Sequence, residues 1–131
     1  MIIEHFAINV ADPRATAAWY TRHLGLRVLR ALDEAPYTHF LADEAGRHVI
    51  EIYGHTRAAV PDYGALDPLV FHIAFVTDDV AGTLQRLLEA GAQRAGDITT
   101  TPTGDEMVFF RDPWGVALQL VRRARPLHEG K

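Results

Sequence analysis

Two histidines occupy matching positions in two similar stretches of the chain. His5 begins the stretch HFAINVADP and His72 begins HIAFVTDDV, and in both stretches an alanine follows two places later. The histidines are 67 positions apart, and Glu51 and Gln119, each in a later apolar stretch, are 68 positions apart. Imidazole nitrogens, a carboxylate oxygen and an amide oxygen form a mixed donor set for a divalent transition metal such as Zn, Ni, Mn, Co or Fe. We therefore expect one metal site made of His5, Glu51, His72 and Gln119.

Strand periodicity places these four side chains on one face of a sheet. Alternate residues of a strand point to opposite faces of the sheet. Each of the four polar residues has an apolar neighbour directly after it, so that neighbour points to one face and the polar residue points to the opposite face. Ile50 and Ile52, for example, suit a face covered by a helix, which leaves Glu51 on the opposite side. A metal on that side would make the burial of Glu51 tolerable, because an ionised carboxylate in an apolar cup is costly unless it is paired.

Each of these residues also has an ordinary structural interpretation. A single histidine on an apolar strand is typically a core residue satisfied by hydrogen bonds. Glu51 alone could pair with an arginine such as Arg47 or Arg111. Taken together, the four residues occupy equivalent positions in two repeats and are expected on the same face of the sheet. This joint pattern favours a shared site.

Each histidine-bearing stretch is followed by a helix signal. In the first half, Asp12 is a good N-cap, Pro13 suits the first helical position and Gly25 marks the end. In the second half, Asp78 or Asp79 caps an apolar-faced run that stops at Gly91. Each half then ends in a hairpin, at 43–53 and at 112–121, whose turn carries an acidic residue and a glycine.

These elements predict a single α+β domain, residues 1–131, built from two tandem βαβββ modules. We place module one at about 1–58, a connector at about 59–68, module two at about 69–123 and a tail at 124–131.

Composition excludes several function classes. A formal net charge of −4 gives no reason to expect nucleic-acid binding. The absence of cysteine rules out disulfides and thiolate metal sites. We find neither a signal-peptide pattern nor an apolar run of membrane-spanning length, so we expect a cytoplasmic protein without a membrane partner.

Three motifs resemble the vicinal oxygen chelate superfamily: HxAxxVxD at 5–12, FHIAF at 71–75 and DPWGVALQL at 112–120. This superfamily includes glyoxalase I, methylmalonyl-CoA epimerase, extradiol dioxygenases, fosfomycin-resistance transferases and the metal-free bleomycin-resistance proteins. The resemblance covers about residues 1–123. It implies a U-shaped, mostly antiparallel curved sheet around a metal, helices on the outer face, and a homodimer. It carries the ligand positions onto His5, Glu51, His72 and Gln119.

Gln119 departs from the pattern of glyoxalase I, which usually has a glutamate there that is both ligand and catalytic base. Gln119 cannot accept a proton at useful pH, although its carbonyl oxygen can still bind a metal. The epimerase branch has the order His, Gln, His, Glu, and this chain has the two halves exchanged. We therefore expect Glu51 to be the catalytic base.

The resemblance implies a divalent-metal-dependent lyase or isomerase, glyoxalase-like or epimerase-like, that acts on a small carbonyl compound bound through two neighbouring oxygens. One alternative is a ring-cleaving or other Fe(II) dioxygenase, since two histidines and a carboxylate also resemble the facial triad of those enzymes. Another is a non-catalytic small-molecule binding protein of the antibiotic-resistance type. The complete set of donors favours an enzyme over a binding protein.

Overall fold

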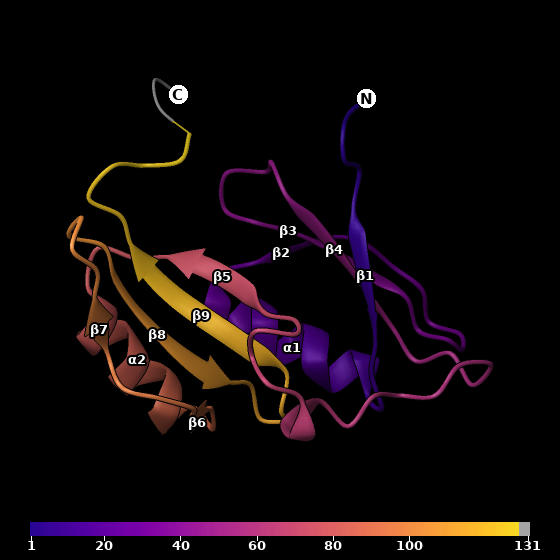
Figure 1. Cartoon of the computed structure of the whole chain (residues 1–131). Coiled ribbons are helices and arrows are strands. Elements are labelled where there is room, and N and C mark those ends of the chain that lie inside the picture. Colours follow the sequence, from indigo (N-terminus) through magenta and orange to yellow (C-terminus); the bar gives the residue numbers. More distant parts are fainter. Residues whose placement is uncertain (129–131) are drawn as a thin grey trace. The chain divides into compact units, whose positions relative to one another are not determined.

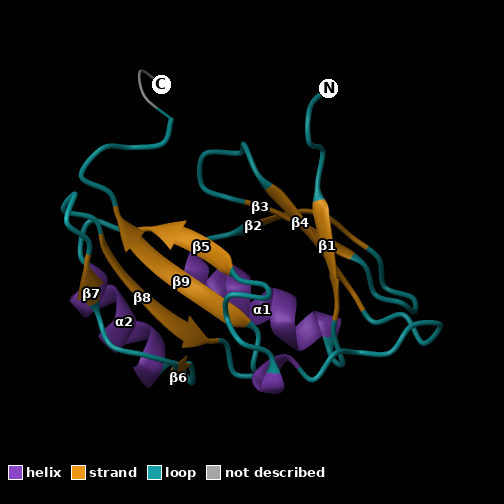
Figure 2. Ribbon diagram, viewed as in Figure 1, coloured by secondary structure: helices purple, strands orange, loops and turns teal. Residues whose placement is uncertain are grey.

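The structure is a computed structural model that describes residues 1–128. Its contacts divide the chain into two compact units, Met1–Pro61 and a second unit that begins at Asp62 (Figure 1). Each unit combines one α-helix with one mixed sheet (Figure 2), which confirms the expected α+β class. Among residues 1–128 we find no helix with the length and apolar character needed to cross a membrane.

The first unit is a four-stranded sheet with a helix packed on β3 and β4. Its strand order is β1-β4-β3-β2, with β1 parallel to β4 and the other pairs antiparallel. Its elements are β1 (Phe6–Asn9), α1 (Pro13–Leu24), β2 (Arg27–Ala31), β3 (His39–Ala42) and β4 (Val49–Tyr53).

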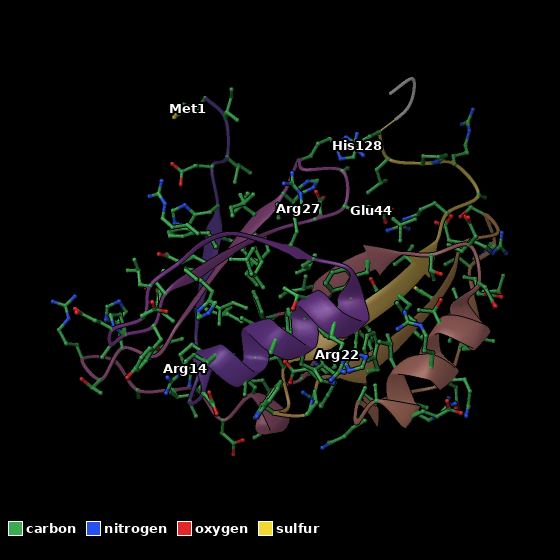
Figure 3. The ribbon with its side chains drawn as sticks, turned by 180° about the vertical axis from the view of Figure 1, so that it is seen from behind. Met1, Arg14, Arg22, Arg27, Glu44 and His128 are labelled. Carbon is green, nitrogen blue, oxygen red and sulfur yellow. The ribbon has the colours of Figure 1, made fainter. Side chains whose placement is uncertain are left out.

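The limits of α1 follow from its capping residues, as the sequence predicts. The Asp12 carboxylate accepts a hydrogen bond from the backbone N–H of Ala15 at 3.0 Å, and Pro13 is the first helical residue. The helix ends at Gly25, whose φ of 74° lies in the left-handed region. Arg14 and Arg22 lie on its exposed side (Figure 3).

The second unit repeats this topology with a divided edge strand. Its strand order is β5-β9-β8-β6, and β7 also pairs with β8. The pair β5 and β9 is parallel and the other pairs are antiparallel, while α2 packs on β8 and β9. Its elements are the 3₁₀ turn η1 (Tyr63–Ala65), β5 (Ile73–Val76), α2 (Val80–Glu89), β6 (Gln93–Arg94), β7 (Thr99–Thr100), β8 (Glu106–Arg111) and β9 (Ala117–Arg122).

Asp79, rather than Asp78, caps α2. Its carboxylate accepts a hydrogen bond from the backbone N–H of Gly82 at 3.0 Å. Leu84 and Leu87 are fully buried against the sheet, as their helical spacing predicts.

The expected alternation of buried and more exposed residues is present in β4. In β4, Ile50 and Ile52 are buried on the helix side, whereas Glu51 is partly exposed on the other. In β9, Leu118 and Leu120 are buried, but Gln119 and Val121 on the other face are buried too, so burial does not alternate in this strand. Each sheet therefore buries one face against its helix and places the predicted polar residues on the opposite face.

Candidate functional site

In the first unit, His5 and Glu51 face each other. Ala7 of β1 is paired with Glu51 of β4, and His5 lies two residues before Ala7, on the same face of the sheet. The Nε2 atom of His5 is 3.4 Å from Oε1 of Glu51, with side-chain exposures of 33% and 18%. The other ring nitrogen, Nδ1, lies 2.5 Å from Oε1 of Glu4. The structure thus brings together two of the four predicted site residues.

These contacts decide which atom of His5 faces Glu51. An ionised carboxylate only accepts hydrogen bonds, so in a neutral ring Nδ1 carries the proton and donates it to Glu4. Nε2 then directs its lone pair toward the Glu51 carboxylate. Two acceptors at this distance repel each other unless a positive charge lies between them, either a proton on Nε2 or a metal ion, so the pair is a suitable place for a cation.

The 3.4 Å separation of His5 Nε2 and Glu51 Oε1 suits two ligands of one metal ion. Zinc binds such atoms at about 2.0–2.2 Å, and two donors at that distance around a tetrahedral ion lie about 3.3–3.6 Å apart. The donor types also match, because imidazole nitrogen and carboxylate oxygen are ligands of zinc and related divalent metals.

In the second unit, His72 and Gln119 occupy the equivalent register. Ala74 of β5 is paired with Gln119 of β9, and His72 lies two residues before Ala74. The Nδ1 atom of His72 is 2.8 Å from the backbone oxygen of Pro68. A carbonyl oxygen only accepts hydrogen bonds, so Nδ1 of His72 donates, and in a neutral ring Nε2 is left with a free lone pair.

Gln119 is almost fully buried, with 7% exposure. Its Nε2 donates to the Met107 sulfur at 3.6 Å, which directs the carbonyl oxygen, the atom able to bind a metal, away from Met107.

A phenylalanine accompanies each histidine. The His5 ring meets Phe40 edge-to-face with centroids 5.7 Å apart, and the His72 ring meets Phe109 in the same way at 5.0 Å. Phe40 is the register partner of Glu51 on β3, and Phe109 is the partner of Gln119 on β8. Phe40 was missed, although its offset of 69 positions from Phe109 nearly matches that of the histidines.

Arg111 holds the segment that supports His72. Its guanidinium donates to the backbone oxygens of Tyr63 at 2.9 Å, Gly115 at 3.0 Å and Leu66 at 2.8 Å. The arginine is therefore engaged in fixing the 3₁₀ turn η1 and the residues that follow it, within the second unit.

Asp112 shapes the turn that leads into β9. The residue is fully buried, and its Oδ1 accepts hydrogen bonds from the backbone N–H groups of Trp114 and Val116, both at 2.9 Å. Gly115 takes a φ of 97° within the same turn. This turn sets the register of β9 and so the position of Gln119.

The carboxyl groups of Asp43 and Asp105 have a lowered pKa, and both belong to turns rather than to the candidate site. Burial acts to raise the pKa of Asp43, but its hydrogen bonds, above all that from the His48 ring at 2.9 Å, outweigh burial and lower it. The backbone N–H of Ala124 and the guanidinium of Arg123, each 2.9 Å away, lower the pKa of Asp105.

Each unit therefore supplies one pair of candidate donors. Within residues 1–128 no group of three or more His, Cys, Asp or Glu side chains is arranged to hold a metal ion. The His5–Glu51 contact is observed, whereas the union of all four donors in one site stays a prediction.

A family model described as Glyoxalase/Bleomycin resistance protein/Dioxygenase superfamily matches residues 2–120. Among curated relatives, a protein named lactoylglutathione lyase from Salmonella typhimurium is 26% identical over 127 residues, which cover 92% of each chain. A probable lactoylglutathione lyase from Vibrio parahaemolyticus is 27% identical over 128 residues, covering 92% of this chain and 89% of the relative.

Two solved structures have a similar fold. A glyoxalase family protein from Bacillus cereus gives a TM-score of 0.79 at 14% identity, with 93% of both chains covered. TnmS3, described as an antibiotic binding protein from Streptomyces sp. CB03234, gives a TM-score of 0.68 at 22% identity, covering 95% of this chain and 99% of that one.

Proposed function

The chain belongs to the Glyoxalase/Bleomycin resistance protein/Dioxygenase superfamily, and from this premise we propose that it is a divalent-metal-dependent lyase or isomerase. Its substrate is a small carbonyl compound that binds through two neighbouring oxygens. The names of the low-identity relatives support lyase chemistry as a class. Gln119, in place of a glutamate, argues against assigning their particular reaction to this chain.

The observation that carries the proposal is the distance of 3.4 Å between His5 Nε2 and Glu51 Oε1. In this proposal His5, Glu51, His72 and Gln119 are the metal ligands. When bound, the metal supplies Lewis-acid polarisation of a substrate carbonyl.

Glu51 is the catalytic base in this proposal. Its carboxylate takes a proton from the carbon next to the substrate carbonyl and returns it in the product. The carboxylate is 18% exposed, so a small molecule can reach it, and the apolar ring of Phe40 lies beside the His5 ring. Gln119 lacks a group that can take a proton at neutral pH, which leaves the base role to Glu51.

Two measurements test the proposal. Elemental analysis of untagged protein, purified without chelator, is expected to find about one divalent metal ion per chain. Incubation of small carbonyl compounds with the protein in D2O, followed by NMR, is expected to show deuterium incorporation at the carbon next to the carbonyl. The exchange should disappear in Glu51→Gln, which largely keeps the metal, and persist in Glu44→Gln. Unchanged exchange in Glu51→Gln rules out the proposed base.

A second candidate is a non-catalytic protein that binds an aromatic or cationic small molecule. It is favoured by the two phenylalanines, Phe40 and Phe109, on the same faces as the histidines. The structural similarity to an antibiotic binding protein agrees with it. Purified protein without stoichiometric metal that nevertheless binds such a molecule would favour this candidate over the enzyme.

The superfamily also supports the proposal that the protein is a homodimer. A monomer has a mass of 14.6 kDa. Light scattering at micromolar protein concentration is expected to give about twice that mass, and a monomer peak would contradict the dimer.

A further inference from the structure

We propose that Glu4 is a positioning residue that holds His5 in the tautomer able to bind a metal through Nε2; the inference rests on the proposed function. Glu4 lies outside the four candidate ligands and its side chain is 86% exposed. Its Oε1 atom is 2.5 Å from His5 Nδ1, while Nε2 of the same ring faces Glu51. The imidazole is thus held between two carboxylates with distinct roles.

The physical basis is the single proton of a neutral imidazole. When Nδ1 donates that proton to a carboxylate, Nε2 has no proton and its lone pair is available to a metal. The same hydrogen bond fixes the orientation of the ring and increases the basicity of Nε2. Without Glu4, Nδ1 would be open to water, and the ring could rotate or carry its proton on Nε2.

The second unit reaches the same arrangement by different means. His72 Nδ1 donates to the backbone oxygen of Pro68 at 2.8 Å, in the segment that Arg111 holds through Leu66. Both histidines therefore present Nε2, one supported by a side chain and the other by the backbone. A single side-chain substitution can remove the support of His5 and leave that of His72 intact. This makes His72 an internal control within the same molecule.

The direct test is ¹⁵N NMR of the histidine side chains in metal-free protein at about pH 8. In the wild type, we expect His5 and His72 to carry the proton on Nδ1. In Glu4→Ala, the His5 signals should shift toward the form protonated on Nε2, while the His72 signals stay in place. Glu4→Gln keeps a side-chain oxygen that accepts a hydrogen bond and should restore the wild-type pattern of His5. Glu44→Ala removes one exposed negative charge from the same unit and should leave both histidines unchanged.

The second readout is the dissociation constant of zinc, measured by competition with a chelating dye. Glu4→Ala should weaken zinc binding by about tenfold or more, the usual effect of removing a group that orients a ligand. Glu4→Gln should recover most of that loss, and Glu44→Ala should bind like the wild type.

A wild-type His5 protonated on Nε2, or a Glu4→Ala variant with unchanged His5 signals, would overturn the role of Glu4. So would a Glu4→Ala variant that binds zinc as tightly as the wild type. If His5 responds to Glu4→Ala but wild-type protein binds no divalent metal, the tautomer assignment holds and the proposed function fails. The two hypotheses can therefore be judged separately.

Discussion

Gly115 lies so close to Gly64 that a Cβ atom at position 115 would come within 2.8 Å of the Gly64 backbone nitrogen. The turn before β9 and the 3₁₀ turn η1 are thus packed backbone against backbone. Arg111 bonds both parts, since its guanidinium donates to the oxygens of Gly115 and Tyr63.

Gly115→Ala should therefore destabilise the protein strongly. A φ of 97° costs a residue with a side chain about 1–3 kcal/mol, and the clash with backbone atoms, which cannot move aside easily, adds to that cost. Urea denaturation measures the loss in the free energy of unfolding. Gly96→Ala is the matched control, because a Cβ there meets no atom within 4 Å, and its effect should stay within about 0.5 kcal/mol. Equal stability of the two variants would contradict the close packing at Gly115.

Asp112→Ala should lower stability by about 2–4 kcal/mol. The substitution leaves the backbone N–H groups of Trp114 and Val116 without their acceptor, and an unsatisfied buried donor costs about 1–3 kcal/mol. Thermal and urea unfolding should both show the loss. Asp97→Ala, at an exposed position, serves as the control and should change stability little. If the unfolding midpoints of Asp112→Ala equal those of the wild type, the turn does not depend on this carboxylate.

The contribution of Asp105 to the free energy of unfolding should decrease as the pH falls into the acid range. Its folded-state pKa is lowered below the ordinary value of 3.8, so the ionised form is favoured by folding. This contribution is fully present above the unfolded-state pKa and is lost as pH falls through the lowered pKa of the folded state. Asp105→Asn should thus be less stable than the wild type at pH 7, and the difference should shrink below about pH 3.9. A difference in urea midpoint that stays constant from pH 7 to the acid range would contradict this linkage.

The sequence was a good guide to the elements because local signals and burial agree there. Asp12, Pro13 and Gly25 mark the ends of α1 in both the sequence and the structure. The alternation in β4 correctly predicted that Ile50 and Ile52 are buried on the face away from Glu51. Capping and strand periodicity act over a few residues, so they can be read without knowledge of the rest of the fold.

The supports of the two histidines could not be predicted in this way. The contact of Glu4 with His5 depends on the orientation of the ring, and the contact of Pro68 with His72 depends on how the preceding loop is folded. Phe40 was missed because its place beside His5 follows from the pairing of β3 with β4, which no short motif records. The predicted βαβββ module has a single strand where the second sheet has two short edge strands, β6 and β7, so this division was not predicted.

Gln119→Glu tests whether position 119 faces a metal. The residue is 7% exposed, and its amide donates to the Met107 sulfur, which a carboxylate cannot do. In metal-free protein, a carboxylate at this buried position should lower the free energy of unfolding by about 1–3 kcal/mol.

Saturating zinc should reverse that loss if position 119 is a ligand, because metal binding to the folded state adds its own free energy to stability. The gain in melting temperature on adding zinc should therefore be larger for Gln119→Glu than for the wild type. Gln119→Leu, which removes the ligand oxygen without adding charge, should gain less than the wild type. Equal zinc-induced shifts in all three proteins would place position 119 outside the metal site and leave His5, Glu51 and His72 as the candidate ligands.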